Sequence, residues 1–407
     1  MRFKLIFFSI IFVAFFLRIW NLSQIPSSLN WDEISHGYNA YSLLNTGKDQ
    51  WGVSWPKFNF RAYGDYPTVA NLYLTIPFVK LLGLNALSIR LPSAMFGLIF
   101  VFLTYYLGLL IFKNRYLSVL LMFFVAISPW TLFPSRAVFQ STIAQTFFLA
   151  GIVFLLYSVK SKLKLLPFGC LFLGLSMYAY HNTRLIAPLI FLSFIIIFYR
   201  QIVIISKHHK KLLLFSLSVF LFLAVPSVVN LLQPESQARS RWVAIINPAS
   251  INEINENRRL FTGSSFINHL INNKITFFLP RFTLNYLNLF NPLPLFITGT
   301  NQYQFNIPNT GLLYPVWLPF FYLGLITFIF LIKKDRNIRF LFFWYLIAII
   351  PSAITIGDYP SIRAVTILPL PLILIILGFQ KTYFFLKIKS IRFLFIVLFL
   401  ILTIFQF

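Results

Sequence analysis

Acidic residues are scarce in this chain of 407 residues. It contains nine Asp and Glu against 34 Lys and Arg, and charged residues make up only 11% of the sequence, whereas soluble domains carry about 25%. Hydrophobic residues reach 58%, and the mean hydropathy is +0.79. These values exclude an ordinary soluble globular protein, and the repeated apolar runs indicate an integral membrane protein.

The positive charge has a simple explanation in such a protein. A formal charge of +25 would suggest nucleic-acid binding if the chain were soluble. In membrane proteins, however, Lys and Arg gather in cytoplasmic loops. Because no RNP, helix-turn-helix or zinc-knuckle pattern is present either, we expect the lipid bilayer as a partner and no nucleic acid.

Several chemical motifs are also missing. The single cysteine, Cys170, excludes an intrachain disulfide and a cysteine-based metal site. The sequence has no Walker A motif, no His-x-x-x-His spacing and no apparent nucleophile–His–acid arrangement. Only Asp32, Glu33 and Asp65 form a plausible set of oxygen ligands, and a divalent metal needs several. We therefore expect no ATP-driven machine, no metal and no cofactor.

Twelve apolar runs are candidates for membrane spans. The first follows Arg2 and Lys4 and has no small-x-small cleavage site after it, so we interpret it as an uncleaved span that starts in the cytoplasm. The runs are 5–20, 68–84, 91–112, 116–133, 138–157, 165–180, 185–199, 212–232, 312–332, 340–356, 364–379 and 391–405.

The distribution of basic residues decides which runs cross. If all twelve cross, the basic clusters at 160–164 and 207–211 face outward, which inverts the positive-inside rule. The most polar run is 68–84, which contains Asn71, Pro77 and Lys80. If this run alone does not cross, every cytoplasmic loop becomes basic. These loops are Lys113/Arg115, Lys160–Lys164, Arg200–Lys211, Lys333–Arg339 and Lys381–Arg392.

The same topology separates the acids. Only Asp335 then faces the cytoplasm, and the other eight of the nine, Asp358 among them, face outward. The sequence therefore predicts an all-α, multi-pass protein with about eleven spans. Segment 68–84 is expected to be a juxtamembrane or re-entrant helix within a long first outer loop.

Two large segments lie outside the cytoplasm in this topology, at 21–90 and 233–311. The second is rich in Asn, Pro and aromatic residues, and we expect it to lie against the membrane surface, where Tyr and Trp are favoured. We predict one transmembrane domain over 1–380, followed by a basic loop and the last span over 381–407.

The first candidate site is Asn30-Trp-Asp32-Glu33, just beyond the first span. As structural residues, Asn30 or Asp32 would cap a helix over 34–44 that Gly47 ends. Capping does not explain two adjacent carboxylates at the membrane surface of so acid-poor a chain. Because such acids are rarely without function, we predict a catalytic role for Asp32 and Glu33.

The second candidate site combines cations with a turn. In Phe60-Arg61-Ala-Tyr-Gly-Asp65-Tyr66-Pro67, Arg61 and the start of the next helix could meet an anionic head group. A plain turn with a surface arginine is the alternative. Three further arginines, Arg136, Arg184 and Arg363, lie at the outer ends of spans. Either their side chains extend to lipid phosphates, or they form a phosphate-binding rim with His181.

These motifs resemble the GT-C superfamily of membrane glycosyltransferases. The resemblance rests on the acidic pair, on Gly64-Asp-Tyr-Pro67 and on Ile89-Arg-Leu-Pro-Ser-Ala-Met-Phe-Gly97. Later motifs extend it over about 5–380, namely Ser128-Pro-Trp, Ser135-Arg136, Tyr180-His-Asn-Thr-Arg184 and Ile350-Pro-Ser-Ala-Ile-Thr355 with Arg363-Ala364. The protein O-mannosyltransferase and lipid A aminoarabinose transferase branch is the most similar.

The resemblance implies an enzyme of the plasma membrane in a bacterium or archaeon. It would transfer a sugar from a polyprenyl-phosphate donor to a hydroxyl acceptor outside the cytoplasm, with inversion. Asp32 would be the general base, and Arg61, Arg136 and Arg184 would balance the charge of the leaving phosphate. Asp65, Tyr66, His181 and Arg363 would complete the donor site.

Two other functions remain alternatives at this point. A transporter or flippase for a polyprenyl-linked sugar would carry charged residues at mid-membrane, and the span centres here lack them. An O-antigen ligase or polymerase would use a diphosphate-linked donor and would not require the carboxylate pair. The sugar and the acceptor are not identified by any motif.

Overall fold

The computed structural model describes residues 2–160, 162–302, 304–357 and 359–407, so Asp358 lies outside the described residues. Across the described part, the secondary structure is helical apart from isolated β-bridges. This confirms the all-α prediction. The first half contains α1 (Arg2–Ile19), α2 (Trp31–Thr46), α3 (Val69–Leu82), α4 (Ala86–Phe112), α5 (Arg115–Ile127), α6 (Pro129–Ser135), α7 (Gln140–Lys160), η1 (Leu163–Leu165), α8 (Leu166–Ser176), α9 (His181–Ile197), α10 (Tyr199–His208) and α11 (Lys210–Asn230).

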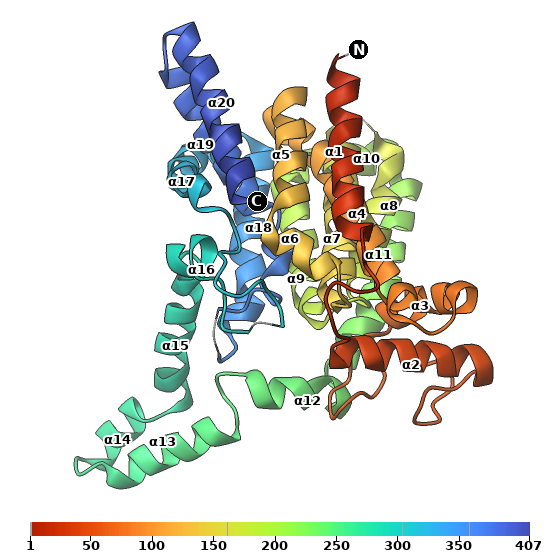
Figure 1. The fold of residues 1–407 in the computed structure, drawn as a ribbon. Helices are drawn as coiled ribbons and strands as arrows, with labels where there is room; N and C mark the ends of the chain where they lie inside the picture. Colours follow the sequence, from red (N-terminus) through yellow and green to blue (C-terminus); the bar gives the residue numbers. More distant parts are fainter. Residues whose placement is uncertain (1, 161, 303, 358) are drawn as a thin grey trace.

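The second half first leaves the bundle and then returns to it (Figure 1). Its helices are α12 (Pro234–Val243), α13 (Pro248–Leu260), α14 (Ser265–Ile271), α15 (Lys274–Asn288), α16 (Pro292–Phe296), η2 (Pro315–Trp317), α17 (Leu318–Leu331), α18 (Arg336–Ala353), η3 (Val365–Ile367), α19 (Leu370–Phe385) and α20 (Lys389–Gln406). Each of the twelve apolar runs coincides with one or two of these helices.

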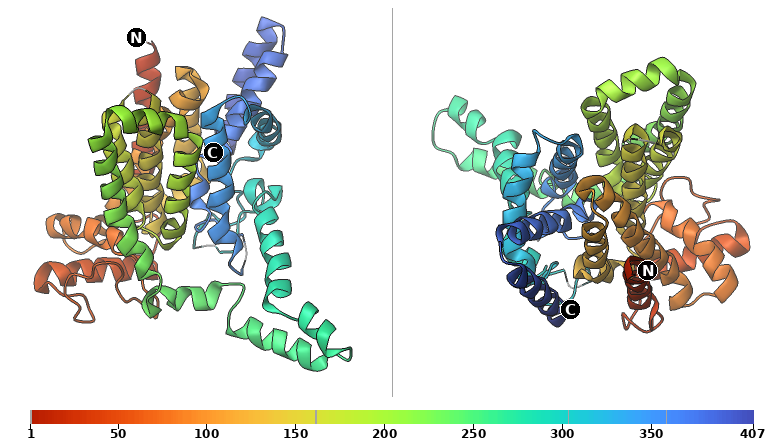
Figure 2. Two further views of the ribbon diagram at one scale, coloured as in Figure 1. Left: turned by 180° about the vertical axis from the view of Figure 1, so that it is seen from behind. Right: turned by 90° about the horizontal axis from the view of Figure 1, so that it is seen from above.

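The helices of the first outer loop lie across one end of the bundle. Both α2 and α3 run across the direction of the bundle helices (Figures 1 and 2). They pack on each other through a small apolar core that includes Leu43, Phe60 and Leu72. The run 68–84 thus forms α3 beside α2, and that α3 does not cross the membrane stays a prediction.

Helix length and apolarity give a lower number of membrane spans than the charge pattern. In the described ranges, four helices are long and apolar enough to cross a membrane: α4, α7, α11 and α20. The number rises to six if the bent pairs α5–α6 and α9–α10 each form one span. The helices α3, α8, α17 and α19 are apolar but shorter. The total of eleven stays a prediction.

Contacts between loops support the proposed sidedness of the bundle. The Lys113 ammonium lies 3.5 Å from the Asp335 carboxylate, and the Arg115 guanidinium lies over the Phe3 ring at 4.9 Å. The N-terminus and two of the predicted cytoplasmic loops therefore meet at one end. The first outer loop and α12 lie at the other end (Figure 1). That the basic end is cytoplasmic stays a prediction from the positive-inside rule.

Close helix packing depends on glycine where α17 meets α19. A Cβ atom on Gly324 would lie 1.7 Å from the Leu374 carbonyl oxygen, and one on Gly378 would lie 1.9 Å from that of Phe320. Small residues allow such backbone approach in membrane bundles. The last helix joins the same core, because the Trp317 indole N–H donates to the Thr403 hydroxyl at 3.1 Å.

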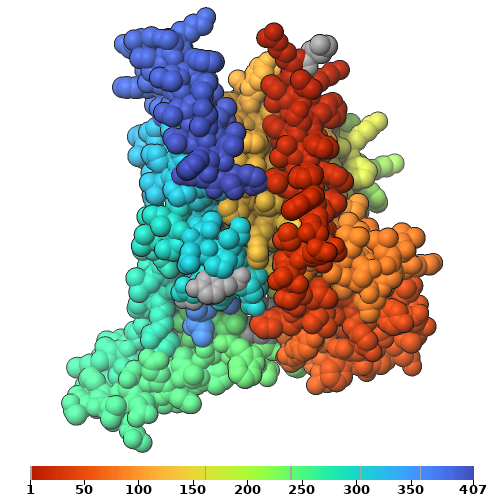
Figure 3. Space-filling view, viewed as in Figure 1, coloured from red at the N-terminus to blue at the C-terminus, as the bar shows by residue number. Residues whose placement is uncertain are grey.

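The second outer segment forms an arm. In the space-filling view, the residues of α13 and α14 project away from the bundle (Figure 3). The end of α15 returns to it, since the Tyr286 hydroxyl donates to the Leu346 carbonyl of α18 at 3.1 Å. The arm is anchored where the Ile245 amide donates to the Ile354 carbonyl at 3.0 Å and the Ile356 amide to that of Val243 at 2.7 Å. Its expected position on the membrane surface stays a prediction.

Candidate functional site

The two predicted catalytic carboxylates begin α2. Asn30 caps the helix: its side chain accepts from the Glu33 amide, and the Glu33 carboxylate accepts from the Asn30 amide, each at 2.9 Å. Gly47 ends the helix in the left-handed conformation with a φ of 69°. The capping alternative is therefore confirmed for Asn30. Glu33 completes the cap through its hydrogen bond with the Asn30 amide.

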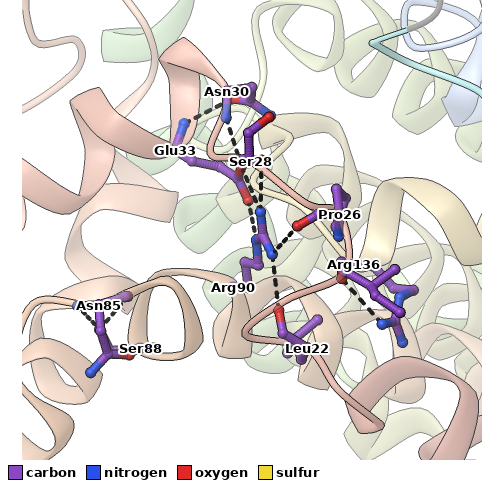
Figure 4. Close-up of polar contacts among 10 residues, drawn as sticks. Leu22, Pro26, Ser28, Asn30, Glu33, Asn85, Ser88, Arg90 and Arg136 are labelled. Carbon is purple, nitrogen blue, oxygen red and sulfur yellow. Dashed lines mark hydrogen bonds and ion pairs between the residues drawn. The ribbon is translucent and has the colours of Figure 1, made fainter.

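Glu33 is also one half of a buried ion pair. Its carboxylate lies 2.7 Å from the Arg90 guanidinium on α4, and both side chains are 1% exposed (Figure 4). The remaining N–H groups of Arg90 donate to three loop carbonyls, those of Leu22, Pro26 and Ser28. The pair fixes the 22–30 loop and the start of α2 onto α4. The structure thus places Glu33 where it positions Asp32.

Arg90 was not among the residues predicted from sequence. It lies in the Ile89-Arg-Leu-Pro motif, but nothing in that motif shows what the guanidinium contacts. A lone arginine at the outer end of an apolar run was the available signal. Buried arginine requires a partner, and Glu33 is one of the eight carboxylates that the predicted topology places on that side.

His36 contacts the backbone of Asp32 from within α2. The ring is fully buried, and burial lowers the pKa of His36 from 6.5 to about 4. The ring is therefore neutral at pH 7, and Nδ1–H donates to the Asp32 carbonyl at 2.7 Å. Phe60 packs edge-on against the ring at 5.0 Å. Asp32 itself is half-buried, at the first turn of α2.

Two of the predicted phosphate-binding arginines hold loops together. The Arg136 guanidinium donates to the carbonyl of Leu17 in the last turn of α1, and to those of Trp20 and Ile25 in the loop that follows. Arg184 is 1% exposed and donates to the Asn59 and Asn230 side chains at 2.8 and 3.0 Å. Arg184 therefore joins the first outer loop to the ends of α9 and α11.

His181 and Arg363 line one cavity of about 260 Å³, which we call pocket A. The Arg363 guanidinium donates to the Thr355 hydroxyl at 2.6 Å, and Asn182 donates to the Arg363 carbonyl at 2.9 Å. The His181 ring lies 2.9 Å from the Tyr66 carbonyl oxygen. The other lining residues are Tyr180, Leu185, Leu231, Ser236, Gln237, Val243, Pro351 and Ile354.

Arg61 and Tyr66 line a second cavity of about 470 Å³, pocket B. Arg61 is exposed, and its guanidinium stacks over the Trp51 indole at 4.1 Å. The same cavity is lined by Asp49, Lys57 and Glu235, among others. It therefore presents charges of both signs beside an aromatic surface.

Asp65 belongs to a tight turn. It exchanges backbone hydrogen bonds with Ala62, both at 2.9 Å, and its carboxylate accepts from the Tyr66 amide at 2.8 Å. Gly64 has a φ of +78°, a conformation that glycine adopts readily. Asp65 lines a third cavity of about 320 Å³ together with Tyr63 and Trp242.

Pockets A and B adjoin. Tyr66 lines pocket B, and its carbonyl contacts His181 of pocket A. Asn230 of pocket B and Ser236 of pocket A both receive hydrogen bonds from Arg184. The fold thus brings Arg61, Tyr66, His181, Arg184 and Arg363 together, at the end of the bundle where α2 begins.

Possible metal ligands do not cluster in the described residues. Among these residues, no group of three or more His, Cys, Asp or Glu side chains is placed to hold an ion. Cys170 is buried in α8.

Comparison with known proteins identifies the fold through solved structures. No protein-family model matches the chain, and no curated protein sequence does. The oligosaccharyltransferase of Archaeoglobus fulgidus in its apo form matches 99% of this chain and 55% of its own, with 13% identity and a TM-score of 0.59.

Two further structures contain lipid phosphates. ArnT from Cupriavidus metallidurans, bound to undecaprenyl phosphate, matches 96% of this chain and 60% of its own, with 14% identity and a TM-score of 0.53. The Archaeoglobus fulgidus oligosaccharyltransferase AglB, in complex with an inhibitory peptide and a dolichol-phosphate, matches 99% and 54%, with 14% identity and a TM-score of 0.59. The chain spans little more than half the length of these proteins. At such identities the likeness establishes the fold.

Proposed function

Because the chain has the GT-C fold of membrane glycosyltransferases, we propose that it transfers a sugar from a polyprenyl-phosphate donor to a hydroxyl acceptor outside the cytoplasm. The observation that carries this proposal is the match of the fold over 99% of the chain. It is supported by similar structures that hold undecaprenyl phosphate or dolichol-phosphate. The acidic pair and pockets A and B at one end of the bundle agree with it.

Asp32 is the proposed general base. The acceptor oxygen attacks the anomeric carbon, Asp32 takes the hydroxyl proton, and the carbon–oxygen bond to the phosphate breaks. Polyprenyl phosphate leaves with the bonding electrons, and the configuration inverts. Glu33 and His36 support this role, since the ion pair with Arg90 and the hydrogen bond to the Asp32 carbonyl hold the start of α2 in place.

Arg61 and Arg363 are the proposed cations for the donor phosphate. Arg61 is exposed in pocket B, and Arg363 lines pocket A beside His181. Arg136 and Arg184 are less suited than the sequence suggested, because their guanidinium groups are occupied by loop carbonyls and amide side chains. We assign these two a positioning role.

The decisive experiment compares donors and one variant. The purified full chain in nanodiscs is given a polyprenyl-monophosphate sugar or a polyprenyl-diphosphate sugar, and product formation is followed by mass spectrometry. We expect transfer from the monophosphate donor. Asp32→Asn should lower the rate by about 100-fold or more, as expected for loss of a general base, without changing the thermal unfolding midpoint.

Three outcomes would count against the proposal. Normal turnover by Asp32→Asn would remove Asp32 as the base. Use of the diphosphate donor alone would assign the chain to the ligase or polymerase type. Accumulation of lipid-linked sugar across proteoliposomes with no donor consumed would instead identify a transporter.

A further inference from the structure

The end of the bundle opposite the candidate site contains cavities of its own. There α10 turns 82° from α9 and lies across the bundle, as the view from above shows (Figure 2). Along α10, Tyr199 and Ile204 are exposed while Ile205 is buried. The cationic residues Arg200, Lys207 and His208 are exposed on the same helix. A helix that exposes both apolar and cationic residues is suited to the plane of the membrane interface.

Two adjoining cavities lie between α10, the end of α7 and the start of α11. One of about 400 Å³ is lined by Lys160, Gln201, His208 and His209, among others. The other, of about 660 Å³, is lined by Lys162 and Lys164, and both include Leu163 and His209. We call the two cavities together the lysine pocket. Its polar lining consists mainly of side chains that donate hydrogen bonds to anions.

The charge around the lysine pocket is of one sign. The sequence contains no Asp or Glu between residues 66 and 234. Asp335, the acid at the same end, is paired with Lys113. None of the ion pairs found among the described residues involves Lys160, Lys162 or Lys164. The pocket therefore carries an uncompensated positive charge next to the membrane interface.

Gln201 adds a second polar feature. Its side-chain oxygen is buried, and in the described part of the chain it has no hydrogen-bond partner. A buried polar atom without a partner costs free energy. A ligand with both a phosphate and hydroxyl groups would satisfy it, since the hydroxyl can donate to the amide oxygen while the lysines bind the phosphate.

We propose that the lysine pocket binds the head group of an anionic phospholipid, through its phosphate and a head-group hydroxyl. Basic pockets between helices at the cytoplasmic surface are suited to anionic head groups, and the exposed apolar and cationic residues of α10 suit this end of the bundle to the membrane interface. The site lies at the far end from pockets A and B, and it does not depend on the proposed transferase activity.

The test measures lipid binding by the full chain in detergent micelles. The probes are dioctanoyl phosphatidylglycerol, dioctanoyl phosphatidylcholine and inorganic phosphate, with affinity read by microscale thermophoresis. We expect phosphatidylglycerol to bind at least tenfold more tightly than the other two. K160Q/K162Q/K164Q should weaken this binding about a hundredfold, since each lysine contributes on the order of fivefold.

A matched variant separates the pocket from general charge attraction. K381Q/K387Q/K389Q removes three exposed lysines at the same end of the bundle, from the end of α19, the α19–α20 turn and the start of α20 (Figure 1). It should change the affinity less than threefold. K160R/K162R/K164R keeps the charge and should bind with the affinity of the wild type. If the Gln variant unfolds, this Arg variant still tests whether positive charge at these three positions is sufficient for binding.

Three results would overturn the proposal. An equal loss in both triple Gln variants would mean that the whole basic end attracts anions without a pocket. Binding of phosphatidylcholine as tight as that of phosphatidylglycerol would remove the role of charge. Binding of inorganic phosphate as tight as that of the lipid would show a phosphate site rather than a lipid site.

Discussion

At the scale of single residues, two adjacent carboxylates have different surroundings. Glu33 is 1% exposed and paired with Arg90 at 2.7 Å, whereas Asp32 is half-buried at the helix start. A catalytic base must reach its substrate, while a buried ion pair serves to hold structure. The pair Asp32–Glu33 therefore combines one residue suited to chemistry with one suited to positioning it.

Glu33→Gln should mainly change stability. The substitution leaves the Arg90 charge buried without its partner, which costs on the order of 3 kcal/mol. We expect a lower thermal unfolding midpoint in detergent, read by intrinsic fluorescence. Asp32→Asn is the matched control, with an unchanged midpoint and lost transfer. If Glu33→Gln unfolded like the wild type yet lost transfer, Glu33 would be catalytic, as the sequence first suggested.

His36 should make the stability of the first outer loop depend on pH. Its pKa in the folded protein is about 4, below the ordinary 6.5, so the unfolded chain binds the proton first. The stabilisation is complete above about pH 6.5 and is lost as the pH falls toward 4, by on the order of 3 kcal/mol. The thermal unfolding midpoint of the wild type should therefore fall between pH 6.5 and pH 4. In His36→Gln this fall should be smaller. Parallel profiles of the two proteins would show that His36 does not titrate.

At the scale of helices, the α17–α19 contact depends on glycine. Gly324→Ala would place a Cβ atom 1.7 Å from the Leu374 carbonyl oxygen, so the two helices must separate. Overpacking of this kind costs about 1–3 kcal/mol, and we expect a lower thermal unfolding midpoint.

The control for this prediction is on the same helix. Ile326 is 54% exposed, and Ile326→Ala should leave the unfolding midpoint nearly unchanged. Equal effects of the two substitutions would mean that α17 and α19 can separate without cost.

At the scale of the whole molecule, the basic loops and the candidate site lie at opposite ends. The ion pair between Lys113 and Asp335 and the lysine pocket belong to one end, while α2, α3 and pockets A and B belong to the other. The positive-inside rule predicts that the first end faces the cytoplasm. In that orientation the proposed site would meet an acceptor outside the cytoplasm.

Cysteine labelling of intact cells would test that orientation. In a Cys170→Ser background, Lys57→Cys and Leu84→Cys should react with a membrane-impermeant maleimide. Lys334→Cys should react only after permeabilisation. All three positions are exposed, but Lys57 and Leu84 lie at the end of the candidate site and Lys334 lies at the basic end. Labelling of Leu84→Cys only after permeabilisation would show that α3 crosses the membrane, because α3 lies between Lys57 and Leu84.

The sequence by itself determined the features that depend on local pattern. Apolar runs, basic loops and the Asn30 cap follow from the order of residues, because burial in lipid, the position of Lys and Arg and helix capping act over short stretches of chain. They were sufficient to predict an all-α membrane bundle, while the GT-C fold was suggested by the resemblance of longer motifs; that α3 does not cross the membrane stays a prediction.

Only the tertiary structure decided how the site residues are used. Arg90 and Glu33 are 57 residues apart, and Arg184 and Asn59 are 125 apart, so no local pattern shows that they meet. Arg136 and Arg184 resembled phosphate ligands until their guanidinium groups were seen to hold loop carbonyls and amides. The carboxylate pair at the start of α2 was visible in the sequence, but its division into a base and a positioning residue came from contacts across the fold.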